Sequence, residues 1–264
     1  MRDSRSTLLN QQGNEHFSKG FYTEAYHCYA SALEVDRCSG DYRALIITLG
    51  NLGNICAVSG RRTQAQAYYQ EVMELQKTIG DERGISITLV NLGNVCADAG
   101  EWERGRAYYL EALDLMNTVG HEEAKAVVLS DLGLVAKETG NDQEAMAYYE
   151  ESLALMRRLG NQTGQADVYR MIARLHLLRQ EYPETISCAQ TSLAMAERLK
   201  DELRMAGAWY VLAGCYEKQK QWKEAITYLE YVVKVDQKHH LPKLQENTDR
   251  LLALKKRSTT TLPS

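Results

Sequence analysis

A pattern of residues recurs every forty positions along most of this 264-residue chain. The clearest marker is a small residue, which stands at Gly13, Gly53, Gly93, Gly133, Ala173 and Ala213. A fixed period of this length is typical of stacked repeats, because one unit is too small to bury its apolar surface alone. The period therefore predicts one continuous stack in place of separate globular domains.

Each repeat contains two stretches with the residue spacing of amphipathic helices. Around Gly93, the residues Leu89, Leu92 and Cys96 lie three or four positions apart, so a helix places them on one face. A second stretch of this kind follows and carries Tyr109 sixteen residues after the marker. We therefore predict an all-α fold built from six helix pairs.

Glycine stands at every twentieth position from Gly20 to Gly160, where each predicted helix ends. Helices often end in the left-handed conformation, which glycine adopts without steric cost. Gln180, Lys200 and Lys220 take these positions in the last two repeats. The helix ends are therefore expected to be less well defined in that part of the chain.

The period divides residues 5–236 into six repeats. Their approximate ranges are 5–40, 41–80, 81–120, 121–160, 161–200 and 201–236. Leucines among charged residues then predict an amphipathic helix over 241–257, which would cover the apolar end of the stack. The last residues, 258–264, are expected to be disordered.

Composition limits the classes of function. A net charge of -4 does not favour nucleic-acid binding, and no apolar run is long enough to span a membrane. Six cysteines lack Cys-x-x-Cys spacing, and the first residues lack the apolar core of a secretory signal, so we expect a cytoplasmic protein. Because phosphate-loop, metalloprotease and nucleophile-elbow motifs do not occur, we expect no enzyme activity, no metal and no cofactor.

The repeat resembles the tetratricopeptide repeat. The resemblance rests on positions that recur together, as at Leu92, Gly93, Cys96, Gly100, Tyr109 and Ala112. The usual unit has 34 residues, and the longer unit here is similar to those of Pins-type adaptors, kinesin light chains and bacterial peptide receptors. The resemblance implies a right-handed superhelical solenoid whose first helices line a concave groove for a peptide or partner protein.

Asparagines on the first helices are candidate ligand-binding residues. Asn14, Asn54 and Asn94 follow the marker directly, and Asn51 and Asn91 stand two residues before it. A carboxamide both donates and accepts hydrogen bonds, so a row of them can pair with the backbone of an extended peptide. The alternative is that these asparagines serve only local packing.

Arginines are the second group of candidates. Arg170 and Arg174 lie one helical turn apart, and such a pair can bind a carboxylate through a forked geometry. We hypothesise that the partner brings an acidic group to this pair, while a solvated pair without a ligand is the alternative. Arg43 and Arg83 occupy an equivalent position near the expected mouth of the groove.

These observations predict a non-enzymatic scaffold or adaptor that binds an extended peptide or partner segment. The alternative function is a regulatory receptor for a small signalling peptide. Self-association through the apolar edge of the first repeat, with Leu8, Leu9 and Phe17, is a further alternative that would give a homo-oligomer. Neither nucleic acid nor membrane is an expected partner.

Overall fold

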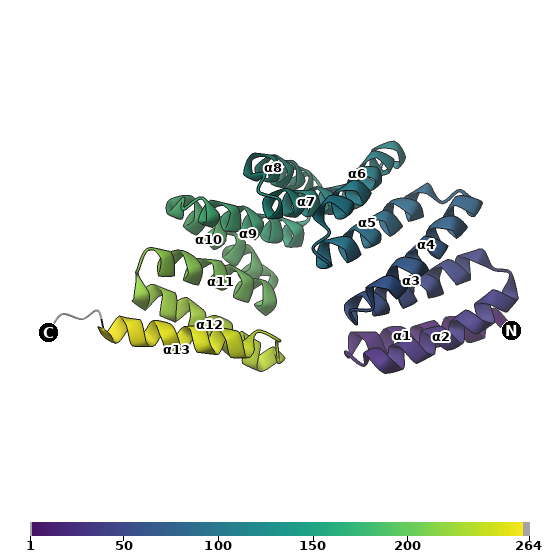
Figure 1. The fold of residues 1–264 in the computed structure, drawn as a ribbon, viewed down its shortest axis with the longest axis horizontal. Coiled ribbons are helices and arrows are strands. Elements are labelled where there is room, and N and C mark those ends of the chain that lie inside the picture. The colour runs from purple at the N-terminus through teal and green to yellow at the C-terminus, as the bar shows by residue number, and fades with distance from the viewer. Residues whose placement is uncertain (1, 261–264) are drawn as a thin grey trace. The chain divides into compact units, whose positions relative to one another are not determined.

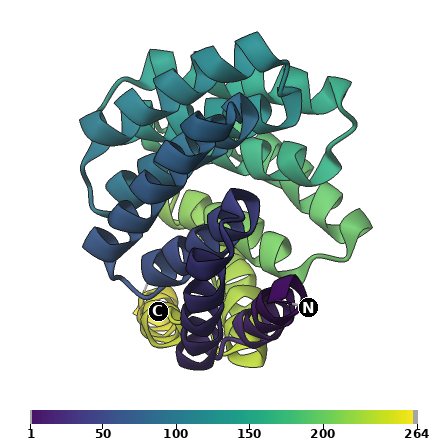
Figure 2. The same cartoon turned by 90° about the vertical axis from the view of Figure 1, so that its right-hand side faces the viewer.

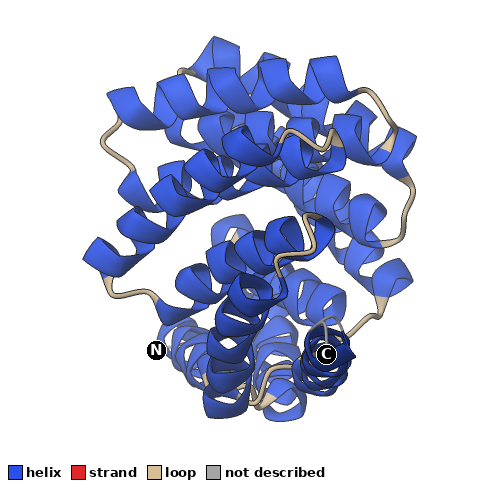
Figure 3. Cartoon of the chain, turned by 90° about the vertical axis from the view of Figure 1, so that its left-hand side faces the viewer, coloured by secondary structure: helices blue, strands red, loops and turns tan. Residues whose placement is uncertain are grey.

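The computed structural model describes residues 2–260, and within this range it contains thirteen helices and no strand (Figures 1 and 3). The helices are α1 Arg2–Ser18, α2 Tyr22–Ser39, α3 Tyr42–Val58, α4 Arg62–Ile79, α5 Glu82–Asp98, α6 Trp102–Val119, α7 Glu122–Glu138, α8 Asp142–Arg158, α9 Gln162–Leu178, α10 Tyr182–Leu199, α11 Glu202–Lys218, α12 Trp222–His239 and α13 Leu244–Thr260. Each repeat thus supplies two helices of similar length, which confirms the predicted all-α class.

The chain divides into two compact units, residues 1–135 and 136–264, which we call unit 1 and unit 2. In unit 1 the helix pairs α1/α2, α3/α4 and α5/α6 stack in chain order (Figure 2). Their shared core contains Tyr29, Tyr69, Leu52, Leu92 and Cys56, all of which are buried. In unit 2 the same kind of core forms among α9 to α13.

The helix ends follow the glycine pattern beyond the last glycine. The eight glycines at every twentieth position from Gly20 to Gly160 have a φ between 69° and 80°. Gln180, Lys200, Lys220 and His240 adopt the same left-handed conformation, with φ between 51° and 60°. The expectation of less defined ends in the last repeats was therefore wrong: the helices end at the same positions, with a strained residue that costs about 1–2 kcal/mol each.

The marker glycine makes room for a tyrosine of the paired helix. A Cβ atom built on Gly93 would lie 2.5 Å from Cε1 of Tyr109, and Gly13 and Gly53 have the same relation to Tyr29 and Tyr69. In the last two repeats the marker is alanine, and the partner position carries a smaller side chain, Ala189 or Leu229. The size of the marker residue and the size of the residue sixteen positions later thus depend on each other.

Each junction between consecutive repeats buries a pair of residues of matched chemistry, twelve positions apart. Thr48 Oγ1 donates a hydrogen bond to Asp36 Oδ2 at 2.6 Å, and Thr88 Oγ1 donates to Gln76 Oε1 at 2.8 Å. The next three junctions carry apolar or small residues at these positions, all buried: Met116 and Val128, Met156 and Val168, and Ala196 and Ala208. The two residues at each of the first two junctions are thus polar and hydrogen-bonded, and the two at each of the next three are apolar or small.

Helix α13 covers the end of unit 2. Leu251 and Leu254 are buried in one cluster with Leu229 and Val232, and Asn247 Nδ2 donates to Asp236 Oδ2 at 2.7 Å. The helix reaches Thr260, so residues 258–260 are helical although disorder was expected for them. Residues 261–264, the rest of that expected tail, lie outside the described residues.

Candidate functional site

The first helices of unit 1 expose one side, which we call the first-helix face. It carries Arg43, Ile47 and Asn54 on α3, and the residues 40 and 80 positions later on α5 and α7. Spacings of four and seven residues place these side chains on one side of each helix. Ile47, Ile87 and Val127 are 59 %, 45 % and 45 % exposed, so a row of β-branched side chains faces solvent in three consecutive repeats.

The asparagines that follow the marker each accept a hydrogen bond from a core tyrosine. The hydroxyl of Tyr69 donates to Oδ1 of Asn54 at 2.6 Å, and the hydroxyl of Tyr109 donates to Oδ1 of Asn94 at the same distance. Asn14 accepts from Tyr29 in the first repeat at 2.7 Å. These three asparagines are exposed, and the bond fixes the carboxamide so that its oxygen faces the core and its Nδ2 group remains for solvent or a ligand.

The tyrosines themselves are buried, and burial raises the pKa values of Tyr69 and Tyr109 well above their ordinary value. They therefore stay protonated at neutral pH and remain donors to the asparagines. The tyrosine and asparagine are fifteen residues apart, and both are absent from the last two repeats. The fourth repeat has Tyr149 but Leu134 in place of the asparagine, so the joint absence from the last two repeats is a partial sequence signal for the pairing.

Asn51 lies in a buried polar chain. Its Nδ2 donates to Oδ1 of Asn10 at 3.0 Å, and Nδ2 of Asn10 donates to Oγ1 of Thr48 at 2.7 Å. Thr48 in turn donates to Asp36, so this chain joins α1, α2 and α3. One donor of Asn51 therefore links the first two repeats. Its counterpart Asn91 takes the same position in α5 and is half-buried, as Asn51 is.

Arg43 and Arg83 are both exposed at the start of the first-helix face. Arg43 lines a pocket of about 500 Å³ with Ile46, Ile47 and Ile79. The pocket has aliphatic walls with one cation, Arg43, and one carboxylate, Asp81, in its lining, which suits an apolar side chain of a partner.

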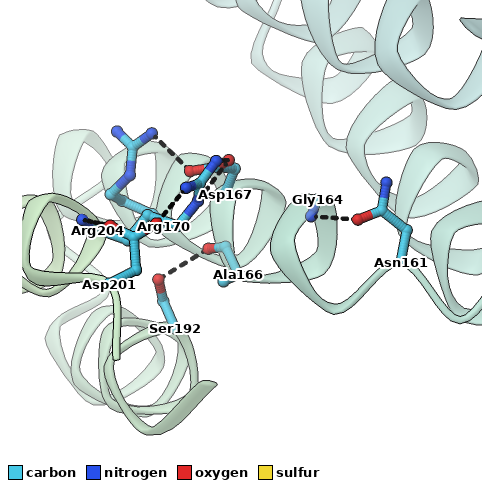
Figure 4. A network of polar contacts seen from close by, with 8 residues as sticks. All are labelled: Asn161, Gly164, Ala166, Asp167, Arg170, Ser192, Asp201 and Arg204. Carbon is cyan, nitrogen blue, oxygen red and sulfur yellow. Dashed lines mark hydrogen bonds and ion pairs between the residues drawn. The ribbon is translucent and has the colours of Figure 1, made fainter. Parts of the chain in front are cut away.

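In unit 2, Arg170 and Arg174, the predicted arginine pair, have different surroundings. Arg170 Nη2 lies 3.3 Å from Asp167 Oδ1, and Arg204 donates to Oδ2 of the same carboxylate from Nε at 3.1 Å and Nη2 at 2.9 Å (Figure 4). Asp167 thus joins α9 to α11, and Arg170 is half-buried beside it. Arg174, in contrast, is exposed and lines a separate pocket of unit 2.

The described residues hold no group of three or more His, Cys, Asp or Glu side chains placed to bind a metal ion. Burial raises the pKa values of Cys56, Cys96, Cys188 and Cys215, which keeps these cysteines as thiols. Within the same part of the chain, no helix is both long and apolar enough to cross a membrane.

The family follows from a sequence profile. The tetratricopeptide repeat profile matches residues 4–78, 84–158 and 164–238, which together span most of the chain. The chain belongs to the tetratricopeptide repeat family. Tetratricopeptide repeat proteins generally mediate protein–protein interaction, and the resemblance found from the repeat pattern is confirmed. A search of curated proteins found no match.

Several solved structures share the fold of this chain. BtubC (BKLC) from P. vanneervenii superposes with a TM-score of 0.64 at 15 % identity, covering 100 % of this chain and 94 % of that one. A signal transduction ATPase with numerous domains from Pyrococcus horikoshii, which has a tetratricopeptide repeat sensor, gives 0.76 at 14 % identity and covers 97 % and 39 %. A Rap protein in complex with competence and sporulation factor gives 0.70 at 14 % identity and covers 96 % and 75 %.

Proposed function

We propose that this protein is a non-enzymatic interaction scaffold whose first-helix face in unit 1 binds an extended segment of a partner protein. The observation that carries the proposal is the fixed orientation of the asparagine carboxamides. Because Oδ1 of Asn54 and Asn94 accepts from tyrosine, Nδ2 is the group left for a partner, and the row donates to backbone carbonyls.

The exposed aliphatic row supports the same proposal. Ile47 and Ile87 lie two turns before Asn54 and Asn94 on the same helices, so donors and apolar contacts alternate along the face. Rows of exposed apolar side chains in successive repeats are typical of interaction surfaces. A partner segment with alternating apolar side chains would cover this row while its carbonyl groups meet the asparagines.

The test uses a substitution that removes the donor and keeps the acceptor. In Asn54→Asp with Asn94→Asp, the carboxylate oxygen still accepts from the tyrosine, so folding is retained, but the Nδ2 donors are gone. Peptides that bind the native protein would be selected from a displayed random library, and their affinity measured by fluorescence anisotropy. We expect a loss of about tenfold to 100-fold for the double variant, because the partner carbonyls lose their donors.

Asn117→Asp is the matched control, because Asn117 is an exposed asparagine on the second helix α6. It introduces the same charge away from the first-helix face and should leave the affinity unchanged. Equal effects of the control and the double variant, or no effect of either, would refute the proposed role of this face.

The alternative function is a regulatory receptor for a small signalling peptide. Its support is the similarity to the Rap protein that was solved with competence and sporulation factor, although this similarity concerns the fold alone. Small-angle X-ray scattering with each selected peptide separates the two functions. A receptor would change its radius of gyration on binding, whereas a scaffold would keep it.

A further inference from the structure

Unit 2 contains a pocket of about 520 Å³ that the proposed function does not use. Residues of α7, α9, α11 and α13 line it, so the C-terminal helix contributes to the pocket as well as covering the core. Its apolar wall includes Leu177, Leu178 and Tyr210. Leu178 is 63 % exposed, which is a large fraction for an aliphatic side chain and leaves apolar surface for a ligand to cover.

Gly214 opens the floor of this pocket. It takes the position that carries Asn54, Asn94 or Arg174 in other repeats, and a Cβ built on it would lie 3.4 Å from Leu177 and 3.6 Å from Arg250. These are ordinary contact distances, so the backbone tolerates a side chain here. A side chain larger than alanine would occupy the pocket itself.

Five cations line the pocket and only one carboxylate, that of Glu217. The cations are Lys137, Arg174, Lys218, Arg250 and Arg257. This is a local excess of positive charge in a chain that has 35 acidic and 31 basic residues overall. A pocket lined by one sign of charge concentrates ligands of the opposite sign.

Of the five cations, Lys137, Arg250 and Arg257 have interactions within the chain, and Arg174 and Lys218 do not pair with a carboxylate in its described part. Arg250 donates to Oε2 of Glu217 from Nε at 2.9 Å and Nη2 at 2.7 Å, and it lies 5.0 Å over the Tyr210 ring. Lys137 forms an ion pair with Glu138. Among the residues that the structure describes, Arg174 and Lys218 have no carboxylate at ion-pair distance, so the pocket offers two uncompensated positive charges beside an apolar wall.

From this geometry we infer that the pocket binds a dianionic group that a partner peptide carries next to a large apolar side chain. A phosphorylated side chain has a charge of about -1.5 to -2 at neutral pH, and two neighbouring carboxylates supply the same charge. Arg174 and Lys218 pair with the anion, and the apolar neighbour covers Leu178 and Tyr210. The inference deepens the proposed function, on which it rests, by assigning a chemistry to one part of the partner.

The test compares four small probes by amide NMR titration of the full chain. Phenyl phosphate and phthalate combine two negative charges with an aromatic ring, benzoate has the ring and one charge, and inorganic phosphate lacks the ring. We expect saturable shifts at residues 174–178 and 210–218 with phenyl phosphate or phthalate, and at least tenfold weaker binding of benzoate and inorganic phosphate. Tighter binding of phenyl phosphate identifies a phosphorylated side chain, and tighter binding of phthalate identifies paired carboxylates.

Three variants test the pocket. Arg174→Gln with Lys218→Gln should lower the affinity for the dianionic probes at least tenfold. Gly214→Leu should have the same effect, because the leucine side chain would fill the floor of the pocket. Gly214→Ala and Lys234→Gln, a change of an exposed cation on α12, are the controls and should bind as the native chain does. Both lysine and arginine positions are exposed, so the charge variant remains informative even where Gly214→Leu fails to fold.

The inference is overturned if benzoate binds as tightly as the dianions, if the shifts lie elsewhere, or if the charge variant keeps its affinity. Asn54→Asp with Asn94→Asp separates this result from the proposed function. That variant should bind the probes normally, since its changes lie in unit 1. If the probes bind but no peptide can be selected from the library, the inference about the pocket is supported and the proposed role of the first-helix face is refuted.

Discussion

Gly93→Ala tests the packing of the marker against the tyrosine. The added Cβ would lie 2.5 Å from Cε1 and 2.7 Å from Cδ1 of the Tyr109 ring, which is buried and held by its bond to Asn94. Overpacking of this kind costs roughly 1–3 kcal/mol, and loss of the tyrosine hydrogen bond adds about 1 kcal/mol. Alanine recovers about 1 kcal/mol of helix propensity over glycine, so the net destabilisation is roughly 2 kcal/mol.

Another repeat of the chain accommodates alanine at the marker position. In the sixth repeat, Ala213 takes the marker position and Leu229 the tyrosine position, and both are fully buried. Gly93→Ala should therefore become neutral or stabilising, by up to about 1 kcal/mol, when Tyr109→Leu is also present. The two substitutions then have a coupling free energy of about 2–3 kcal/mol, which is large for one contact.

Urea unfolding followed by circular dichroism measures the four free energies of this cycle, and hydrogen exchange of amides in α5 and α6 locates the loss. Gly50→Ala is the matched control, since an added Cβ there meets no atom within 4 Å, and it should stabilise the protein by about 1 kcal/mol. The reasoning fails if Gly93→Ala stabilises as much as Gly50→Ala, or if its cost persists beside Tyr109→Leu.

Three further predictions concern the helix ends, the junctions and a half-buried carboxyl group. Lys200→Gly should raise the free energy of unfolding by up to about 1 kcal/mol in urea, because it relieves a φ of 55°, whereas Lys200→Ala should not. Thr48→Val should cost about 2 kcal/mol, because Asp36 loses its donor and Asn10 loses Thr48 as an acceptor. Adding Asp36→Met should recover the part of the loss that the unpaired carboxylate causes, and equal costs with and without Asp36→Met would contradict the matched-pair account. Desolvation raises the pKa of Asp131 from 3.8 to about 7, so stability should fall as pH rises through that range, by at most about 1.4 kcal/mol per pH unit. Asp131→Asn should remove this slope in thermal unfolding measured from pH 4 to 8, and an unchanged slope would show that another group causes it.

The sequence was sufficient for the helices, because their signals are local and repeated. The forty-residue period and the glycines coincide with the observed helix boundaries, and the side chains of Asp41, Asp81, Asn161 and Asp201 cap the helices that follow them. Lys200 is an exception, because its side chain did not predict the left-handed conformation that it adopts. Helix α10 still ends at Lys200 in the left-handed conformation and packs against α9 and α11, so tertiary packing overrides the local preference for glycine.

The candidate site was less predictable, because it depends on which partner each polar side chain finds. Helical spacing places Asn54 at the edge of the core but does not tell whether its oxygen meets a tyrosine or a ligand. Arg170 and Arg174 look equivalent in the sequence, yet only Arg170 lies beside Asp167. The pocket at Gly214 depends on α13, whose contribution lies outside the repeat pattern.

The matched junction pairs have a consequence for assembly. A nascent chain of similar repeats exposes several apolar surfaces at once, and any of them is able to stack on the wrong neighbour or on another chain. A misplaced junction here would set the Asp36 carboxylate against Val128, or Met116 against Thr48, and a buried polar group without a partner costs about 1–3 kcal/mol. The buried pairs therefore distinguish the two polar junctions from the three apolar ones, and this disfavours stacking of a polar junction surface on an apolar one, within a chain or between molecules.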